Sequence, residues 1–87
     1  MTSLSDVEIL HRVRAFVQRE FLYMRPDFAL ADDDSLLKSG VVDSMGVLEV
    51  LGFLEETFGV RPGDDEITEA NLGSLRAISD FVARNQH

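Results

Sequence analysis

The sequence predicts an all-α fold, a four-helix bundle with a long first loop and a short third helix. Apolar residues recur at spacings of three and four in three separate segments, the pattern of helices with one buried face. No segment sustains the alternation of a strand. The chain has 87 residues and no cysteine, so we expect one small domain over residues 1–87, without disulfides or thiolate metal sites.

The first helix is predicted to begin near Ser5, because Ser5 and Glu8 have the Ser-x-x-Glu spacing of a capping box. Pro26 prevents much further helix. The predicted inward stripe is Leu10, Val13, Val17, Phe21 and Met24. A connection then runs from about Arg25 to Val42, longer than is usual in a compact domain. We expect Leu36 and Leu37 to hold it on the core.

The second helix is predicted to begin at Asp43–Ser44 and to end at Gly59, a typical C-cap residue. Its expected inner stripe is Val47, Leu51, Leu54 and Phe58. A short third helix is predicted near Asp65–Ala70. Ser74 is expected to cap the last helix, whose inward residues are Leu75, Ile78, Phe81 and Val82.

Acidic residues are concentrated in the middle of the chain. The formal net charge is −8, and residues 32–70 hold eleven acids against two bases, Lys38 and Arg61. Phosphate would be repelled, so we expect no nucleic-acid and no membrane partner; a basic protein surface would be attracted. Signal-peptide and membrane-spanning segments are not recognisable, and with the absence of cysteine this favours a cytoplasmic protein.

Known catalytic and metal motifs fit the sequence poorly. Residues 42–46 lack the first glycine of a G-x-S-x-G nucleophile elbow, and no strand precedes them. Neither His11 nor His87 is placed by the sequence to act as a base for Ser44. Asp32 and Asp34 begin an EF-hand pattern that Leu36 and Leu37 break. We therefore expect a non-catalytic protein with no metal site.

Ser44 is the residue that the sequence singles out. At the first turn of a helix, free N–H groups and the positive end of the helix dipole favour an attached phosphate. Asp43 is placed to cap that helix or to help hold a metal ion while a second enzyme delivers the phosphate. An aspartate–serine pair is also an ordinary helix start, so the pair alone leaves both interpretations open.

Residues 36–60 resemble the phosphopantetheine attachment region of acyl carrier proteins. The pattern consists of Asp43-Ser44-Met45, apolar Leu48, acidic Glu49, paired Glu55–Glu56 and Phe58-Gly59. The resemblance implies a 4'-phosphopantetheine arm on Ser44 that carries an acyl or aminoacyl group as a thioester, with chemistry supplied by the cofactor and by partner enzymes. The implied partners are a phosphopantetheinyl transferase, an acyl- or aminoacyl-loading ligase and a downstream acyltransferase or synthase, and a monomer is expected.

The exposed face of the second helix is the predicted docking surface. On a helical wheel Met45, Glu49, Gly52 and Glu56 lie opposite the core stripe, and Leu48 belongs to the family pattern. An adaptable methionine among carboxylates suits docking to several basic partners. The glycines at 46 and 52 each cost about 1 kcal/mol of helix propensity relative to alanine, and close approach of a partner or of the arm would explain them.

The cargo is expected to be short or polar. The run Met45-Gly46 is similar to D-alanyl and other aminoacyl carriers, which suggests an amino acid or small acyl group in secondary metabolism. Phenylalanines on or beside the inward stripes leave little spare volume for a long chain: Phe16, Phe21, Phe53, Phe58 and Phe81. Two alternatives to a carrier stay open, namely an acidic helical interaction module without a prosthetic group and a small regulator that binds divalent ions through Asp32–Asp34.

Overall fold

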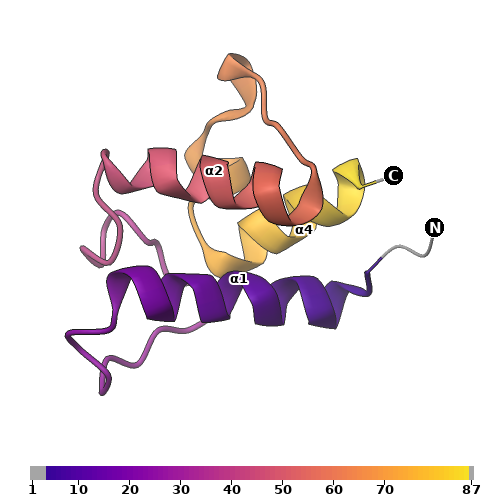
Figure 1. Ribbon diagram of the computed structural model, residues 1–87. Helices are drawn as coiled ribbons and strands as arrows, with labels where there is room; N and C mark the ends of the chain where they lie inside the picture. The colour runs from indigo at the N-terminus through magenta and orange to yellow at the C-terminus, as the bar shows by residue number, and fades with distance from the viewer. Residues whose placement is uncertain (1–3, 87) are drawn as a thin grey trace.

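The computed structural model describes residues 4–86, which form helices and turns and contain no strand. α1 (Asp6–Phe21) and α2 (Gly46–Phe58) run in opposite directions, and α4 (Leu75–Asn85) lies across them (Figure 1). Two short pieces, η1 (Asp64–Glu66) and α3 (Glu69–Leu72), lie between α2 and α4 in the chain. The predicted all-α bundle with a long first loop and a short third helix is therefore confirmed.

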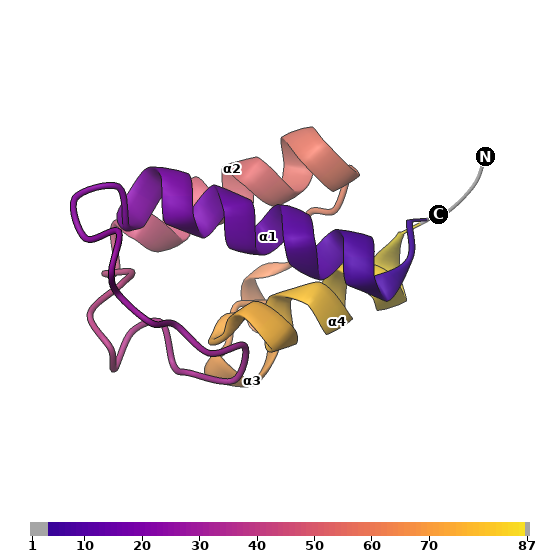
Figure 2. The same cartoon turned by 90° about the horizontal axis from the view of Figure 1, so that it is seen from below.

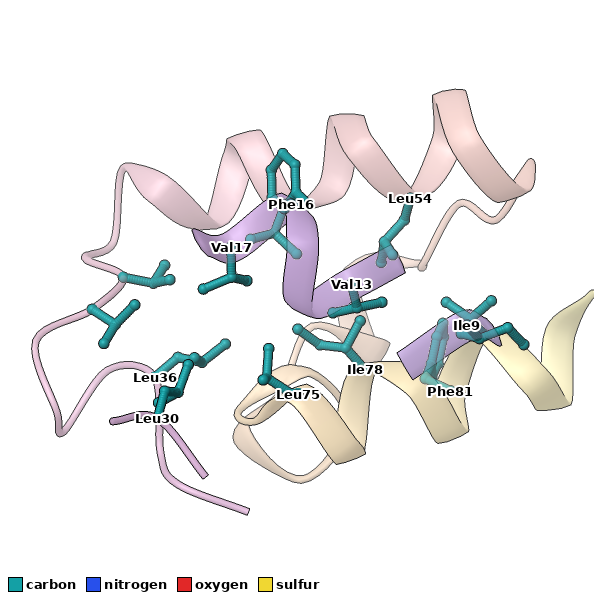
Figure 3. Close-up of a cluster of buried hydrophobic side chains, with 14 of the residues drawn as sticks. Ile9, Val13, Phe16, Val17, Leu30, Leu36, Leu54, Leu75, Ile78 and Phe81 are labelled. Atoms are coloured by element: carbon teal, nitrogen blue, oxygen red, sulfur yellow. The ribbon is translucent and has the colours of Figure 1, made fainter. Parts of the chain in front are cut away.

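The core lies between α1, α2 and α4. Side chains from all three helices point into this space (Figure 3), and Ile9, Leu54, Leu75 and Ile78 are fully buried. Burial of each such side chain stabilises the fold by roughly 1.5–3 kcal/mol. Viewed from below, α2 and α4 lie on opposite sides of α1 (Figure 2). The ends of the described chain also meet, since the side chain of Gln86 bonds both the amide and the carbonyl of Leu4.

The cap of α1 agrees with the prediction, but its inward face is rotated. Ser5 Oγ accepts a hydrogen bond from the amide of Glu8 at 3.2 Å. The residues that point inward are Ile9, Val13, Phe16 and Val17, whereas Leu10 and Phe21 are only half-buried. The assignment of Met24 to the stripe was wrong: the helix ends at Phe21, and Met24 is 77% exposed in the turn beyond it.

The long loop between α1 and α2 is held by an ion-pair network. Asp32 pairs with Arg14 of α1 and with Arg76 of α4, and the carbonyl of Asp32 accepts a hydrogen bond from the amide of Arg76 at 2.9 Å. Leu36 is buried and its amide bonds the carbonyl of Gly73, as expected for a residue that anchors the loop. Leu37, in contrast, is 49% exposed and does not fill that role.

The inward face of α2 is also rotated from the predicted one. Val50 and Leu54 are buried, while the predicted Val47, Leu51 and Phe58 are half-buried. Val50 was missed because a partly apolar helix surface allows several stripes, and the neighbours decide which one is covered. The predicted end is correct, since Gly59 has a left-handed conformation with φ of 69°.

The second half of the chain follows its prediction most closely. Ser74 caps α4 through a 3.0 Å hydrogen bond from the amide of Ala77. All four residues expected to point inward are buried: Leu75, Ile78, Phe81 and Val82. The predicted helix near Asp65–Ala70 is instead two short pieces, η1 and α3, with Thr68 capping α3 between them.

Candidate functional site

Ser44 lies at the end of the long loop, in the turn that leads into α2. The regular helix begins at Gly46, two residues later than predicted, and both Ser44 and Met45 are exposed. In the part of the chain that the structure describes, the amides of Ser44 and Met45 donate no hydrogen bond. The Ser44 hydroxyl is therefore open to a second enzyme, beside free donors at the positive end of a helix.

Asp43 makes the hydrogen bonds of a helix cap. Its Oδ1 accepts from the amide of Gly46 at 2.7 Å, and its carbonyl accepts from the amide of Val47 at 3.2 Å. Such caps stabilise a helix by about 0.5–2 kcal/mol. The cap fixes the turn that carries Ser44, as expected for Asp43 from the sequence.

Gly46 is needed for close packing inside the molecule. A Cβ at this position would lie 2.8 Å from Cε1 of Phe21 and 3.0 Å from Cγ1 of Val42. The end of α1 thus packs directly on the start of α2, behind the turn of Ser44. The expectation that a partner or the arm explains this glycine is wrong, because Phe21 already occupies the space.

The expected docking residues belong to two surfaces. Met45 and Leu48 are 72% and 64% exposed near Ser44. Glu49, Gly52 and Glu56 instead line a groove between α2 and α1. The nearby Glu55 pairs with Arg61, whose pKa it raises by accepting a hydrogen bond and by its charge. Glu56 is therefore the carboxylate of the Glu55–Glu56 pair that is free to meet a partner.

A small apolar hollow lies under the start of α2. It has a volume of about 110 Å³ and is lined by Leu36, Leu37, Val42, Val47 and Val50, together with residues 67–69, 72 and 73. A cavity of about 150 Å³ holds benzene, so this hollow has room for a few carbon atoms. This small apolar space lies beside the helix that Ser44 precedes.

A phosphodiester fits the turn of Ser44. The group needs an accessible serine and hydrogen-bond donors at a helix N-terminus, and exposed Ser44 with the unpaired amides of Ser44 and Met45 supplies both among the described residues. Asp43 directs its carboxylate to the amide of Gly46 and so leaves the donors of Ser44 and Met45 available. Nothing in this turn obstructs a covalent arm that leaves Ser44 toward solvent.

Comparison with protein families gives a match over most of the chain. A family described as "phosphopantetheine attachment site" matches residues 11–82. The chain belongs to this family. A search of curated proteins found no match. The protein is thus a carrier with covalently attached 4'-phosphopantetheine, and Ser44 lies within the matched range together with the turn described above.

The aspartates of the long loop in this carrier already have partners within the fold. Asp32 pairs with Arg14 and Arg76, Asp33 pairs with the same Arg76, and the carboxylate of Asp34 accepts a hydrogen bond from the amide of Ala31. Among residues 4–86 no cluster of three or more acidic or histidine side chains is arranged to hold a metal ion. The same residues include no helix that is both long enough and apolar enough to cross a membrane.

Sequence reasoning missed the residues of α1 that face α2. Arg12, Ala15 and Arg19 line the groove opposite Glu49, Gly52 and Glu56. The sequence does contain a signal for this pairing, because residues 12–19 and 49–56 follow the same pattern. Each segment begins and ends with a charged residue, has valine second, a small residue fourth, phenylalanine fifth and an apolar residue sixth. The charges are positive in residues 12–19 and negative in residues 49–56. The carrier-protein pattern used in the sequence analysis does not include residues 12–19.

Proposed function

We propose that this carrier holds an acyl or aminoacyl group as a thioester on a 4'-phosphopantetheine arm attached to Ser44. The observation that carries the assignment to Ser44 is its exposed hydroxyl at the capped start of α2, within the matched residues. A transferase joins the serine oxygen to the phosphorus of coenzyme A that bears pantetheine; the pyrophosphate bond breaks, 3',5'-adenosine bisphosphate leaves and the serine hydroxyl proton is released. The thiol of the arm then receives the cargo.

The protein itself is proposed to be non-catalytic. It serves as substrate for the transferase and for a loading ligase, and it presents the cargo to a downstream acyltransferase or synthase. Exposed Met45 and Leu48 beside Ser44 supply an adaptable apolar contact, and Glu49 and Glu56 attract basic partner surfaces. We propose that it acts as a cytoplasmic monomer and a single carrier domain, and that Asp43 positions the turn during transfer.

The cargo is proposed to be small, either an amino acid or a short acyl group. The apolar hollow of about 110 Å³ is lined in part by Val47 and Val50 of the helix that Ser44 precedes. A long chain would have to displace buried side chains, and such repacking costs about 1–3 kcal/mol. A small group needs no such change, which supports an aminoacyl or short acyl carrier, as in secondary metabolism.

The attachment site is tested by mass spectrometry. The chain is incubated with coenzyme A and broad-specificity transferases, and one phosphopantetheine group should be added and mapped to Ser44. Ser44→Ala should prevent the addition while unfolding within about 0.5 kcal/mol of the parent, because the described hydrogen bonds assign the cap to Asp43.

Ser39→Ala is the matched control. Ser39 lies in the same loop, and its hydroxyl donates to the carbonyl of Leu36, so this variant removes a serine without touching Ser44. It should be modified like the parent chain. A parent chain that several transferases leave unmodified, or addition to Ser44→Ala, would contradict the proposal.

A further inference from the structure

The groove between α1 and α2 has walls of opposite charge. It has a volume of about 630 Å³ and is open to solvent along its length. Arg12 and Arg19 stand on the α1 wall together with one acid, Glu20, and Glu49 and Glu56 stand on the α2 wall, so the net charges of the two walls are opposite. The two arginines, like the two α2 glutamates, are seven residues apart, which is two helical turns or about 10.5 Å.

The floor of the groove is aromatic, and the middle of each wall carries a small residue. Phe16 of α1 and Phe53 of α2 stack with ring centroids 4.1 Å apart. Midway along the walls stand two small residues, Ala15 and Gly52. A Cβ at Gly52 would have no heavy atom of the described residues within 4 Å, so no packing contact among residues 4–86 requires a glycine there. The missing side chain leaves the backbone of α2 open to close approach from outside.

The arginines of the α1 wall and the glutamates of the α2 wall form no ion pair among residues 4–86. The ion pairs of this part of the chain join Asp32 and Asp33 to arginines and Glu55 to Arg61, and none includes Arg12, Arg19, Glu49 or Glu56. Arg19 makes a cation–π contact with Phe16, 5.9 Å from the ring centre, which keeps its guanidinium over the floor. These four groups are therefore available to a molecule that lies in the groove.

The seven-residue spacing of the charges on each wall matches the repeat of an α-helix lying in the groove. The two walls are antiparallel helices, and a third helix packs along such a pair with its side chains between theirs. Its positions i and i+7 would lie beside both charges of a wall at once. An acidic flank would face Arg12 and Arg19, and a basic flank would face Glu49 and Glu56.

We propose that the α1–α2 groove docks a helix of a partner protein that has acidic residues along one flank and basic residues along the other. This surface adjoins the turn of Ser44, with which it shares Glu49, and would operate with or without the arm. It would orient a partner by charge on both sides, whereas a uniformly acidic face attracts without orienting. A second copy of the chain is the alternative occupant, and it would make the parent chain a dimer.

The probe is a designed helical peptide of about 20 residues, long enough for a helix in water. It carries glutamates along one flank, lysines along the other at i and i+7, and small apolar residues between them. We expect it to bind Ser44→Ala, which has no arm, with an affinity that falls as salt rises. A control peptide of equal composition carries one glutamate and one lysine on each flank, and its affinity should be lower by about tenfold or more.

Charge exchange in the protein gives the decisive comparison. Arg12→Glu with Arg19→Glu should weaken binding by about tenfold or more, because attraction at one wall becomes repulsion. Adding Glu49→Arg and Glu56→Arg should restore it, since the walls have only exchanged sign and the same peptide fits when turned end for end. Arg25→Glu with Arg84→Glu, outside the groove, is the control for net charge.

Blocking the groove tests the same idea without changing charge. Gly52→Trp places a large side chain where the structure has open space, so it should keep the helical circular dichroism spectrum and lose binding. No binding by the parent chain, equal binding of both peptides, or failure of the four-residue exchange to restore binding would overturn the proposal. A dimer of the parent chain that the two arginine substitutions break would also overturn it, in favour of self-association.

Discussion

Two glycines of α2 differ in what surrounds them. Gly46 lies against Phe21 and Val42, at contact distances for a Cβ of 2.8 and 3.0 Å, whereas Gly52 faces open space. Both have the helical backbone conformation of α2, in which glycine is less favourable than alanine by roughly 0.5–1 kcal/mol. The same substitution is therefore expected to have opposite effects at the two positions.

Gly46→Ala should lower the free energy of unfolding by about 1 kcal/mol, because overpacking at Phe21 outweighs the gain in helix propensity. Gly52→Ala should raise it by about 0.5–1 kcal/mol. Both free energies are measured by urea unfolding. Equal slopes of the unfolding free energy against urea concentration would show that the surface exposed on unfolding has not changed. Equal stabilisation by the two substitutions would show that the contact with Phe21 does not constrain the start of α2.

At the scale of elements, α2 has no basic residue over residues 44–58 and presents Glu49 and Glu56 toward α1. Glu49 lies nearer to Ser44 in the chain and also lines a hollow with Asp43 and Met45. A transferase with a basic surface that approaches Ser44 would meet Glu49 early, so this residue should affect the rate of association.

Glu49→Lys should slow the modification of Ser44 several-fold and weaken its dependence on salt, and Glu56→Lys should have a smaller effect. Rates are followed by mass spectrometry at two salt concentrations. Glu8→Lys makes the same charge change in the first turn of α1, at the end of the antiparallel pair opposite to the start of α2, and serves as control (Figure 1). Unchanged rates in both α2 variants would place docking elsewhere, such as on the loop before Asp43.

At the scale of the whole molecule, the space for cargo is limited by how the loop is closed over the core. Asp32 ties the long loop to α1 and α4 at once, and Leu36 anchors it beneath α2. The hollow between this loop and α2 has a volume of about 110 Å³, smaller than a cavity that admits benzene. The loaded arm should therefore leave the core unchanged when its cargo is small.

The effect of cargo on the core can be measured by loading the arm with an alanyl group or with an octanoyl group. Neither should raise the melting temperature relative to the unloaded arm, and alanyl should leave the NMR signals of Val50, Leu54 and Phe58 in place. The chain without an arm is the control for effects of phosphopantetheine itself. A higher melting temperature with octanoyl, with large shifts of these core signals, would mean that the chain enters the bundle and that the cargo proposal is wrong.

Short-range hydrogen bonds made the ends of the elements predictable. Ser5, Asp43 and Ser74 each bond an amide three residues ahead, and Gly59 takes a left-handed conformation, so these signals are complete within a few residues of sequence. The identity of Ser44 as the candidate attachment site depended on the same local pattern and on the family resemblance. The acidity of the middle segment was likewise a property of sequence alone.

Only the tertiary structure decided which face of each helix is buried and which residues of other elements that face contacts. A rotation of 100° separates Ile9 from Leu10 and Val50 from Leu51, and the neighbouring helices determine which of two apolar residues is buried. Gly46 is explained by Phe21, and Asp32 by Arg14 and Arg76, across separations that no local pattern reveals. The groove arises in the same way, because its walls are 37 residues apart in sequence and meet only where α1 and α2 pack side by side.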